Sequence, residues 1–377
     1  MGAADIRHLA GAVPVKIVWF IDHLRPDGTQ RVLTQLVAGL SAHGHSQAVV
    51  CLNDSWDQAI LNELHSSGCE VRIIGKAALL TGTGIYRTWR WLRAERFDAA
   101  VTLLFYSDVV GRTLAHAAGV PRVVTYIQAR NTNYTFWQRW CVRRTMRWAD
   151  RVVVCSRSLS DYAIEAEGAT EGKVSVIPHG IRVNGVYAPP ENQSLRSELH
   201  IPVDCYLIGS LGRLTYQKGY DILLDALARM PEENVHVLMA GTGEMLPSLQ
   251  AQAAGLGIAE RVHWVGYRRD VPRILQDIDI YVQPSRFEGM PNAVLEAMAA
   301  ERPIVASAVD GHCELIEDGI SGWLVPGENP AATARALSEG LIDWNEAFRR
   351  GKEARRRALD LYSLDKMVAG WEDLLES

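Results

Sequence analysis

The architecture follows from residues 286–298, which read Arg286-Phe287-Glu288-Gly289-Met290-Pro291-Asn292-Ala293-Val294-Leu295-Glu296-Ala297-Met298. They follow the apolar run 280–282, which is typical of a buried strand, and they continue into a helical pattern. Gly289 lets the backbone approach a ligand closely, and Pro291 suits the first helical position, where a missing N–H costs nothing. Because a helix N-terminus presents amide donors and a positive dipole end, we expect this loop to hold a phosphate.

Short apolar runs of the same kind recur along the whole chain and alternate with helical patterns. Seven lie in the first half (15–21, 48–52, 71–74, 99–104, 123–127, 152–155 and 174–177), and six lie in the second (206–211, 235–240, 262–265, 280–282, 304–306 and 323–325). Strands that alternate with helices predict α/β domains of the doubly wound type, with parallel sheets covered on both faces. Ligand sites in such domains gather at the carboxyl ends of the strands.

The length and composition fit two such domains. The chain has 377 residues, of which 48% are hydrophobic, so two full cores can form. Residues 184–202 are rich in turn formers and predict a linker, so we expect one domain over 1–187, a second over 188–361 and a last helix over 362–377. Residues 1–13 lack the apolar core of a secretory signal, and no apolar run approaches the roughly 20 residues of a membrane span. Six scattered cysteines without Cys-x-x-Cys pairs favour a reducing, cytoplasmic location.

Two carboxylates flank the expected helix start. Glu288 and Glu296 are eight positions apart, so one stays in the loop beside the phosphate. The other lies more than a turn inside the helix, where it can reach a polar group farther along an extended ligand, such as a ribose. The spacing alone also fits a surface helix with two solvated glutamates.

Two cations follow the strand 206–211. Arg213 and Lys218 emerge from one loop, five positions apart, and Gly219 and a helical pattern follow them. Two cations so placed can clamp a diphosphate, although a solvated pair is the simpler alternative. A second sharp turn into a helix occurs at Gly28, after the first strand of the chain.

Taken together, these motifs resemble retaining glycosyltransferases with the GT-B fold, of the E-x₇-E type (group 1, family four) that includes many bacterial polysaccharide and lipid-glycan transferases. The resemblance implies two facing Rossmann-like domains with a cleft between them, an acceptor-side first domain and a nucleotide-sugar-binding second domain. The last helix is then expected to cross back to the first domain. The catalytic residues that the resemblance implies are Arg213, Lys218 and Glu288. The donor-binding residues that it implies are Gly28, Arg213, Lys218, Gly266, Tyr267, Gly289, Met290, Asn292 and Glu296.

The roles that the resemblance assigns are specific. Arg213 and Lys218 would neutralise the leaving nucleoside diphosphate, Glu296 would hold the ribose, and Glu288 would contact the sugar. Fixed positive charge at the departing phosphate would stabilise the transition state without a metal. We therefore expect no cofactor and no required metal. Asp277-Ile278-Asp279 matches the D-x-D metal motif of a different glycosyltransferase fold, but it closes a helix and enters a strand, and we interpret it as structural.

The chain departs from the family pattern at three positions. The loop after 123–127 carries a histidine in many members, but here it reads Gln128-Ala129-Arg130-Asn131-Thr132-Asn133, and Arg130 and Asn131 are the acceptor-side candidates. Asp27 stands where the family often has the first of two glycines, and His179 stands where it usually has Asn.

We therefore expect a retaining enzyme that moves a hexose or N-acetylhexosamine to a lipid-linked or polysaccharide acceptor hydroxyl. A UDP-sugar is the favoured donor, and GDP-mannose is the other candidate. A nucleotide-sugar epimerase of the same fold, or a non-catalytic partner of another glycosyltransferase, remain alternatives. A nucleic-acid partner is not expected, because no basic groove pattern is present.

Basic and aromatic residues concentrate in part of the first half. Residues 1–187 hold 21 Lys and Arg against 15 Asp and Glu, and 87–151 hold 12 arginines against four acids, although the whole chain has a net charge of −5. In 137–148 the helical period puts Val142, Met146 and Ala149 on one side. The same period groups Trp137, Trp140 and Trp148 on the other side, near Arg144.

This aromatic side has two interpretations. It meets an anionic membrane or a glycolipid acceptor, or its rings pack beneath a neighbouring loop. We expect a peripheral enzyme at the inner face of the plasma membrane, with Trp89 and Trp91 contributing further rings.

Overall fold

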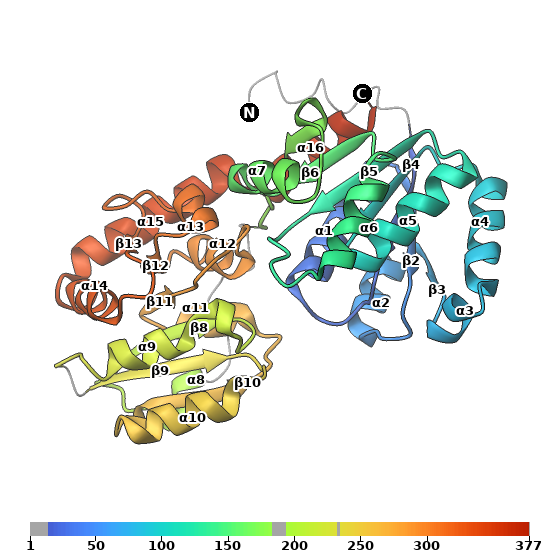
Figure 1. Cartoon of the computed structure of the whole chain (residues 1–377). Helices are drawn as coiled ribbons and strands as arrows, with labels where there is room; N and C mark the ends of the chain where they lie inside the picture. The colour runs from blue at the N-terminus through green and yellow to red at the C-terminus, as the bar shows by residue number, and fades with distance from the viewer. Residues whose placement is uncertain (1–13, 183–193, 232–233, 377) are drawn as a thin grey trace, which may run out of the picture. The chain divides into compact units, whose positions relative to one another are not determined.

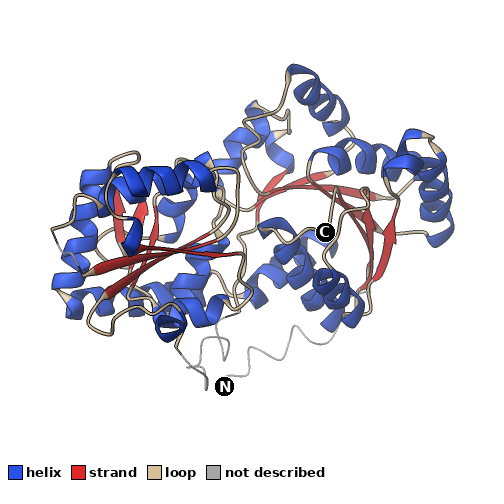
Figure 2. Cartoon of the chain, turned by 90° about the horizontal axis from the view of Figure 1, so that it is seen from below, coloured by secondary structure: helices blue, strands red, loops and turns tan. Residues whose placement is uncertain are grey.

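The computed structural model describes residues 14–182, 194–231 and 234–376, and these form two compact units. The first unit combines the described residues up to Gly180 with those from Leu364 onward, and the second runs from Ile181 to Ser363. The expected boundary at 187/188 lies outside the described residues. Each unit is built around one sheet with helices packed on it (Figure 2).

The first unit contains a seven-stranded sheet in which every pairing is parallel, in the order β3-β2-β1-β4-β5-β6-β7. Its strands are β1 (Lys16–Ile21), β2 (Ser46–Cys51), β3 (Glu70–Ile73), β4 (Ala99–Leu103), β5 (Arg122–Ile127), β6 (Arg151–Val154) and β7 (Val174–Val176). Its helices are α1 (Gly28–Ala42), α2 (Gln58–Ser66), α3 (Lys76–Leu80), α4 (Thr83–Glu95), α5 (Phe105–Ala118), α6 (Phe136–Met146), α7 (Arg157–Glu165), the 3₁₀ turn η1 (Glu171–Lys173) and α16 (Leu364–Glu376).

Both faces of this first sheet are buried. In β1, Val18 and Phe20 belong to a core cluster with residues of α4 and α5. Their neighbour Trp19 points to the other face, where its ring lies 5.4 Å from that of Trp371 in α16. Trp371 is fully buried, so the end of the chain completes the core of the first unit. On the face of Val18 and Phe20, α5 lies between α4 and α6 (Figure 1).

The second unit contains a six-stranded parallel sheet in the order β10-β9-β8-β11-β12-β13. Its strands are β8 (Tyr206–Leu211), β9 (Val235–Ala240), β10 (Val262–Gly266), β11 (Ile280–Gln283), β12 (Ile304–Ser307) and β13 (Trp323–Val325). Its helices are α8 (Leu195–Glu198), α9 (Tyr220–Leu227), α10 (Leu246–Gly255), α11 (Val271–Asp277), α12 (Asn292–Ala299), α13 (Asp310–Leu315), α14 (Pro330–Ile342) and α15 (Trp344–Leu361), with the 3₁₀ turns η2 (Tyr216–Lys218) and η3 (Ala259–Arg261).

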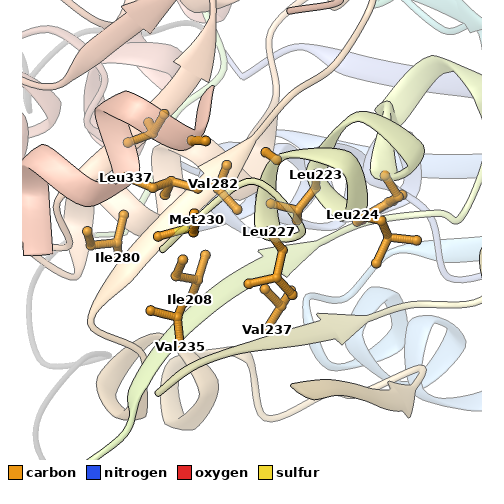
Figure 3. Packing of buried hydrophobic residues seen from close by; sticks show 14 of the residues in the cluster. Ile208, Leu223, Leu224, Leu227, Met230, Val235, Val237, Ile280, Val282 and Leu337 are labelled. Atoms are coloured by element: carbon orange, nitrogen blue, oxygen red, sulfur yellow. The ribbon is translucent and has the colours of Figure 1, made fainter. Parts of the chain in front are cut away.

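The core of this second unit joins α9 and α14 to the sheet. Ile208, Val237 and Val282 from three strands pack with Leu223 and Leu337 from the two helices (Figure 3). All five side chains are fully buried. This packing makes the central strands a rigid base for the loops that leave their carboxyl ends.

The predicted fold class is confirmed. All thirteen predicted strands are present, each with bounds within two residues of the expected ones. One detail of the helix that holds Glu296 is wrong, because Pro291 is the residue before α12 and not its first helical residue. Its ψ of 111° keeps Pro291 extended, and the helix begins at Asn292. Among the described helices, none is long and apolar enough to cross a membrane.

Candidate active site

The strand order reverses direction at one place in each sheet, between β1 and β4 in the first unit and between β8 and β11 in the second. At such a switch point the loops leaving two neighbouring strands diverge to opposite faces, and the resulting crevice binds ligands in open α/β sheets. In the second unit, η2 with Lys218 follows β8, and Glu288 follows β11. The predicted site residues therefore lie where this topology places a ligand.

Lys218 and Glu288 form a direct ion pair across this switch point. The Lys218 Nζ donates to Oε1 of Glu288 at 2.7 Å, and the two side chains are only 15% and 6% exposed. Ser285 Oγ donates to the same oxygen at 2.7 Å, and Gln217 Nε2 donates to the other at 3.3 Å. Burial would raise the pKa of Glu288, but Lys218, His312 and Ser285 together hold this pKa below its usual range. Glu288 is thus a charged, buried carboxylate.

The loop after β8 is fastened to the loop after β11 by further contacts. The Arg286 N–H donates to the carbonyl oxygen of Gln217 at 2.8 Å, and Gln217 Nε2 donates to the carbonyl oxygen of Phe287 at 3.0 Å. The Arg286 guanidinium makes a two-pronged bond to Asp221 at 2.6 and 2.9 Å and lies over the ring of Tyr216. These contacts fix the distance between the Lys218 and Glu288 backbones.

Two glycines allow the loops to approach this closely. Gly219 has a φ of +66°, and a Cβ built there would lie 2.1 Å from the carbonyl oxygen of Pro284. A Cβ at Gly311 would lie 2.1 Å from the carbonyl oxygen of Gly289. Any side chain at these two positions would push apart the loops that carry Lys218, Glu288 and the start of α13.

A chain of buried polar groups supports Glu288 from below. Tyr281 donates through its hydroxyl to Gln283 Oε1 at 2.5 Å, and Gln283 Nε2 donates to Ser285 Oγ at 2.8 Å. Ser285 then donates to Glu288. Tyr281, Gln283 and Ser285 are fully buried, so the carboxylate is oriented by rigid neighbours and not by solvent.

His312 is a buried member of this cluster that the sequence analysis missed. Its Nδ1 lies 2.8 Å from the carbonyl oxygen of Ser307, and the Ser307 hydroxyl donates to the carbonyl oxygen of Ser285. The side chain is fully buried, and this burial lowers its pKa. Glu288 raises the pKa of His312 in part, and Lys218 lowers it. The sequence could have indicated it, because His312 follows the predicted strand 304–306 and residues that follow parallel strands lie at the same sheet edge as Glu288.

The start of α12 lies beside the ion pair. Gly289 and Met290 are buried, Asn292 is half-buried, and the side chain of Pro291, the residue before the helix, makes no capping hydrogen bond. Glu296 lies one turn further and is only 3% exposed. The structure therefore brings the two glutamates into the interior of one loop–helix segment, and a surface helix with two solvated glutamates is excluded.

The other predicted donor residues lie on neighbouring loops. Arg213 is exposed in the loop after β8, and Gly266 ends β10 with a φ of +65°. The Gly241 N–H donates to the Gly266 carbonyl oxygen at 2.8 Å, which links the loops after β9 and β10. Tyr267 is 52% exposed next to it.

The corresponding switch point in the first unit is already occupied by a carboxylate. Asp22, after β1, accepts from the backbone N–H groups of Ser107 and Tyr106 at 2.7 and 3.1 Å, at the start of α5. The start of α1 is also capped, because Asp27 accepts from the Gly28 N–H at 2.8 Å. Both helix N-termini that could hold a phosphate there are therefore met by the chain's own acids.

The acceptor-side candidates Arg130 and Asn131 are held by internal contacts. The Asn131 N–H donates to the Tyr162 hydroxyl at 3.0 Å, and its Nδ2 donates to Glu167 Oε1 at 2.9 Å. Burial raises the pKa of Glu167. One guanidinium nitrogen of Arg130 lies 3.5 Å from the Ser158 carbonyl oxygen.

The Asp277 and Asp279 carboxylates serve the structure, as the sequence analysis expects. Asp277 accepts from the Leu195 N–H, and Asp279 accepts from the Leu207 N–H at 2.7 Å and pairs with Arg196 at 2.6 Å. They join α8 to β8. Within the described parts of the chain, no three His, Cys, Asp or Glu side chains are grouped as metal ligands would be.

The aromatic set expected at a membrane is smaller than predicted. Trp91 is buried in the core of the first unit, so its prediction as a surface ring is wrong; Thr88, Trp91 and Leu92 form the buried side of α4. Trp89 donates to the Ala117 carbonyl oxygen, and Trp148 stacks on His116.

What remains exposed is a patch on α6 that we call the α6 aromatic patch, made of Phe136, Trp137 and Trp140, which are 74, 69 and 51% exposed. Val142, Met146 and Ala149 are buried, as the helical period predicts.

Comparison with known proteins identifies a family for each half of the chain. Residues 205–343 match the family model for glycosyl transferases group 1, and residues 26–184 match the model for glycosyltransferase family 4. An uncharacterized glycosyltransferase of Methanocaldococcus jannaschii is 30% identical over 227 residues, which are 58% of this chain and 57% of that protein. The UDP-Gal:alpha-D-GlcNAc-diphosphoundecaprenol alpha-1,3-galactosyltransferase of Escherichia coli is 27% identical over 76% of this chain and 77% of its own length.

The fold also matches solved structures. The Anabaena protein HepE, solved in complex with UDP and glucose, superposes with a TM-score of 0.86 at 22% identity, over 96% of this chain and 99% of that chain. The two parallel-sheet α/β units are thus those of the GT-B glycosyltransferase structures.

Proposed function

Because this chain belongs to the glycosyltransferases of group 1 and family 4, we propose that it moves a hexose or N-acetylhexosamine from a nucleotide sugar to an acceptor hydroxyl with retention of configuration. A UDP-sugar is the favoured donor, because the related E. coli enzyme is named for UDP-Gal and HepE was solved with UDP. GDP-mannose remains the other candidate.

One observation carries the proposal. The two switch points of the chain differ, because Asp22 fills the one in the first unit, whereas Lys218 brings a cation to the one in the second. The second switch point therefore combines a cation with the N-terminus of α12, where the preceding residue, Pro291, makes no side-chain capping bond. A nucleoside diphosphate is the ligand class that such a site favours.

The proposed roles follow from this placement. Lys218 and Arg213 stabilise the diphosphate as the bond between the sugar C1 and the phosphate oxygen breaks, so no metal is required. Glu288 holds the sugar, Glu296 holds the ribose, and the loop at Gly266 and Tyr267 contacts the base. The acceptor oxygen bonds to C1 on the same face, and its proton passes to the departing phosphate.

The proposed acceptor is lipid-linked. The E. coli relative is named for a diphosphoundecaprenol-linked sugar, and another relative, from Rhizobium meliloti, is named for lipopolysaccharide core biosynthesis. The α6 aromatic patch supports this choice, because exposed Trp rings favour the headgroup layer of a bilayer. Arg144, in the last turn of α6, and Arg147, which directly follows the helix, are exposed, and a basic residue near an anionic leaflet contributes about 1 kcal/mol.

Vesicle cosedimentation tests the membrane contact. Binding should rise with anionic lipid, fall with salt, and decrease strongly in the double variant Trp137→Ser/Trp140→Ser. Trp344→Ser, at a 44% exposed ring of α15 in the other unit, is the matched control and should bind as the unchanged protein does. An absence of binding at low salt would favour a soluble acceptor. Arg139 and Arg143 are unsuited to charge reversal, because both donate to backbone carbonyls of adjoining segments.

A donor panel tests the enzymatic proposal. UDP-, GDP- and ADP-sugars are screened for thermal stabilisation, since a ligand at 100 times its Kd adds about 2.7 kcal/mol to the native state. The stabilising sugar is then incubated with lipid-linked acceptors, and the product anomer is assigned by NMR. Donor turnover into an epimer without acceptor would indicate an epimerase. Stabilisation by no nucleotide sugar would point to a non-catalytic partner.

A further inference from the structure

In the unliganded site the positive charge of Lys218 is already balanced by the negative charge of Glu288. Lys218 is the cation of the switch point; its side chain is 15% exposed, and its Nζ is already bonded to Glu288 at 2.7 Å. A nucleoside diphosphate that contacts Lys218 adds negative charge beside a carboxylate that is 5% exposed. Arg213 also meets the diphosphate in the proposed function, but its side chain is exposed. Within the shielded part of the site one ammonium then serves two anions, which is unfavourable unless another positive charge appears there.

His312 is the group that can supply this charge. Its Nδ1 faces the carbonyl oxygen of Ser307 at 2.8 Å, and since a carbonyl only accepts, Nδ1 carries the proton of the neutral ring. Nε2 then holds a lone pair. This atom is buried and has no hydrogen-bond partner among the described residues, which is costly for a group that serves only packing.

The contacts of His312 tie it to Glu288. Ser307 orients the ring through its carbonyl oxygen, and its hydroxyl donates to the Ser285 carbonyl oxygen. The Ser285 hydroxyl in turn donates to Glu288. Gly311, the neighbour of His312, packs against the Gly289 carbonyl oxygen. The imidazole and the carboxylate thus sit on two segments that are in direct contact.

The charged surroundings favour uptake of a proton only when an anion arrives. Several elements bring titratable or charged groups near α13: Glu288 of the loop after β11 and Lys218 of η2, which act on the pKa of His312, and Glu296 of α12. Arg357 of α15 and Tyr362 donate to the carbonyl oxygens of Leu315 and Glu314 at the end of α13. The helix α13 itself carries Asp310, Cys313 and Glu314. Burial lowers the pKa of His312 and Lys218 lowers it further, while Glu288 and the Ser307 carbonyl oppose them. The ring is therefore neutral before ligand binds.

We propose that His312 is a positioning residue for Glu288, and that Nε2 of His312 takes up one proton from solvent when a nucleoside diphosphate binds at Lys218. This inference rests on the function proposed above. The imidazolium then stays beside Glu288 and keeps the carboxylate charged and oriented toward the sugar, while Lys218 turns to the phosphate. No bond to the substrate is made, and the proton returns to solvent when the diphosphate leaves.

Calorimetric titration in buffers of different ionisation enthalpy measures the proton directly. The probes are UDP-glucose and GDP-mannose, because their diphosphates are diesters that do not titrate near neutral pH. At pH 7.5 we expect uptake of ~0.5–1 proton per bound nucleotide sugar, and an affinity that falls up to about tenfold per pH unit as the pH rises. His312→Asn, which can still donate to the Ser307 carbonyl, should bind with uptake near zero and a flat pH profile.

His236→Gln is the matched control. This histidine lies on β9 of the same unit, bonded to His263, and its replacement should leave the uptake unchanged. Binding without proton uptake by the unchanged protein, or equal uptake in His312→Asn, would overturn the inference and leave the proposed function standing. Binding of neither nucleotide sugar would overturn the proposed function, and this inference with it.

Discussion

Replacing Lys218 by Ala removes the cation that neutralises a buried carboxylate, and we expect the second unit to lose about 3 kcal/mol of unfolding free energy. The Nζ–Oε1 distance is 2.7 Å, and both side chains are largely shielded from solvent. At an effective dielectric constant of about 20, the attraction between unit charges at this distance is about 6 kcal/mol. Roughly half of it offsets desolvation, and the remainder is lost with Lys218.

Hydrogen exchange measured by mass spectrometry assigns this loss to the second unit, because peptides of β8 and β11 report its local opening free energy. Glu288→Gln removes the carboxylate charge that Lys218→Ala leaves unpaired. The unfolding free energy of the double variant Lys218→Ala/Glu288→Gln should therefore be within about 1 kcal/mol of that of Glu288→Gln alone. Lys352→Ala, at an exposed lysine of the same unit, should change the protection little. Unchanged protection in Lys218→Ala, or fully additive losses in the double variant, would refute a buried, coupled pair.

Three further results are expected. Calorimetry should show that Glu296→Ala weakens UDP or GDP binding, whereas Glu288→Gln spares nucleotide affinity and lowers transfer; equal loss of affinity in both would contradict the division of roles. EDTA should leave transfer unchanged, and a complete loss that Mn²⁺ restores would contradict the roles of Arg213 and Lys218. The folded-state pKa of His312 is lowered. Below the pKa of about 6.5 of a histidine in the unfolded chain, the unfolded chain therefore binds a proton at His312, whereas the unliganded folded protein does not. Stability of the second unit should therefore fall as the pH drops below about 6.5, and denaturation of His312→Asn should show a shallower fall, whereas an identical fall would contradict a neutral buried ring.

Buried parallel strands are the part of this molecule that the sequence predicts best. Runs such as 206–211 and 280–282 are continuously apolar because both faces of these sheets are covered, and turn residues bound each run. The rule that parallel strands end at one sheet edge then suffices to bring Lys218 and Glu288 to the same place. Their direct ion pair was not predictable, since it depends on how two loops 70 positions apart fold against each other.

The features that sequence reasoning missed depend on the same kind of long-range contact. Asp22 caps a helix 85 positions away, and nothing near Asp22 in the chain shows that its carboxylate fills an anion site. His312 lies beyond a strand end, but only the packing of Gly311 on Gly289 places its ring beside Glu288. For Trp91, the pattern of arginines and aromatics in α4 did not reveal which side of the helix meets the sheet. Pro291 misled for a local reason, because proline is compatible with both the first helical position and the extended residue before it.

The central claim is that Arg213 and Lys218 stabilise a leaving nucleoside diphosphate at the switch point of the second sheet. The most direct measurement is the rate of nucleoside diphosphate release from the stabilising nucleotide sugar, in the presence of a lipid-linked acceptor, by the unchanged protein and by Arg213→Ala, Lys218→Ala and Lys352→Ala. The first two variants should be slower by about 10²–10³, the range for lost transition-state charge stabilisation, while Lys352→Ala should match the unchanged protein. Release near the unchanged rate in both Arg213→Ala and Lys218→Ala would contradict the claim.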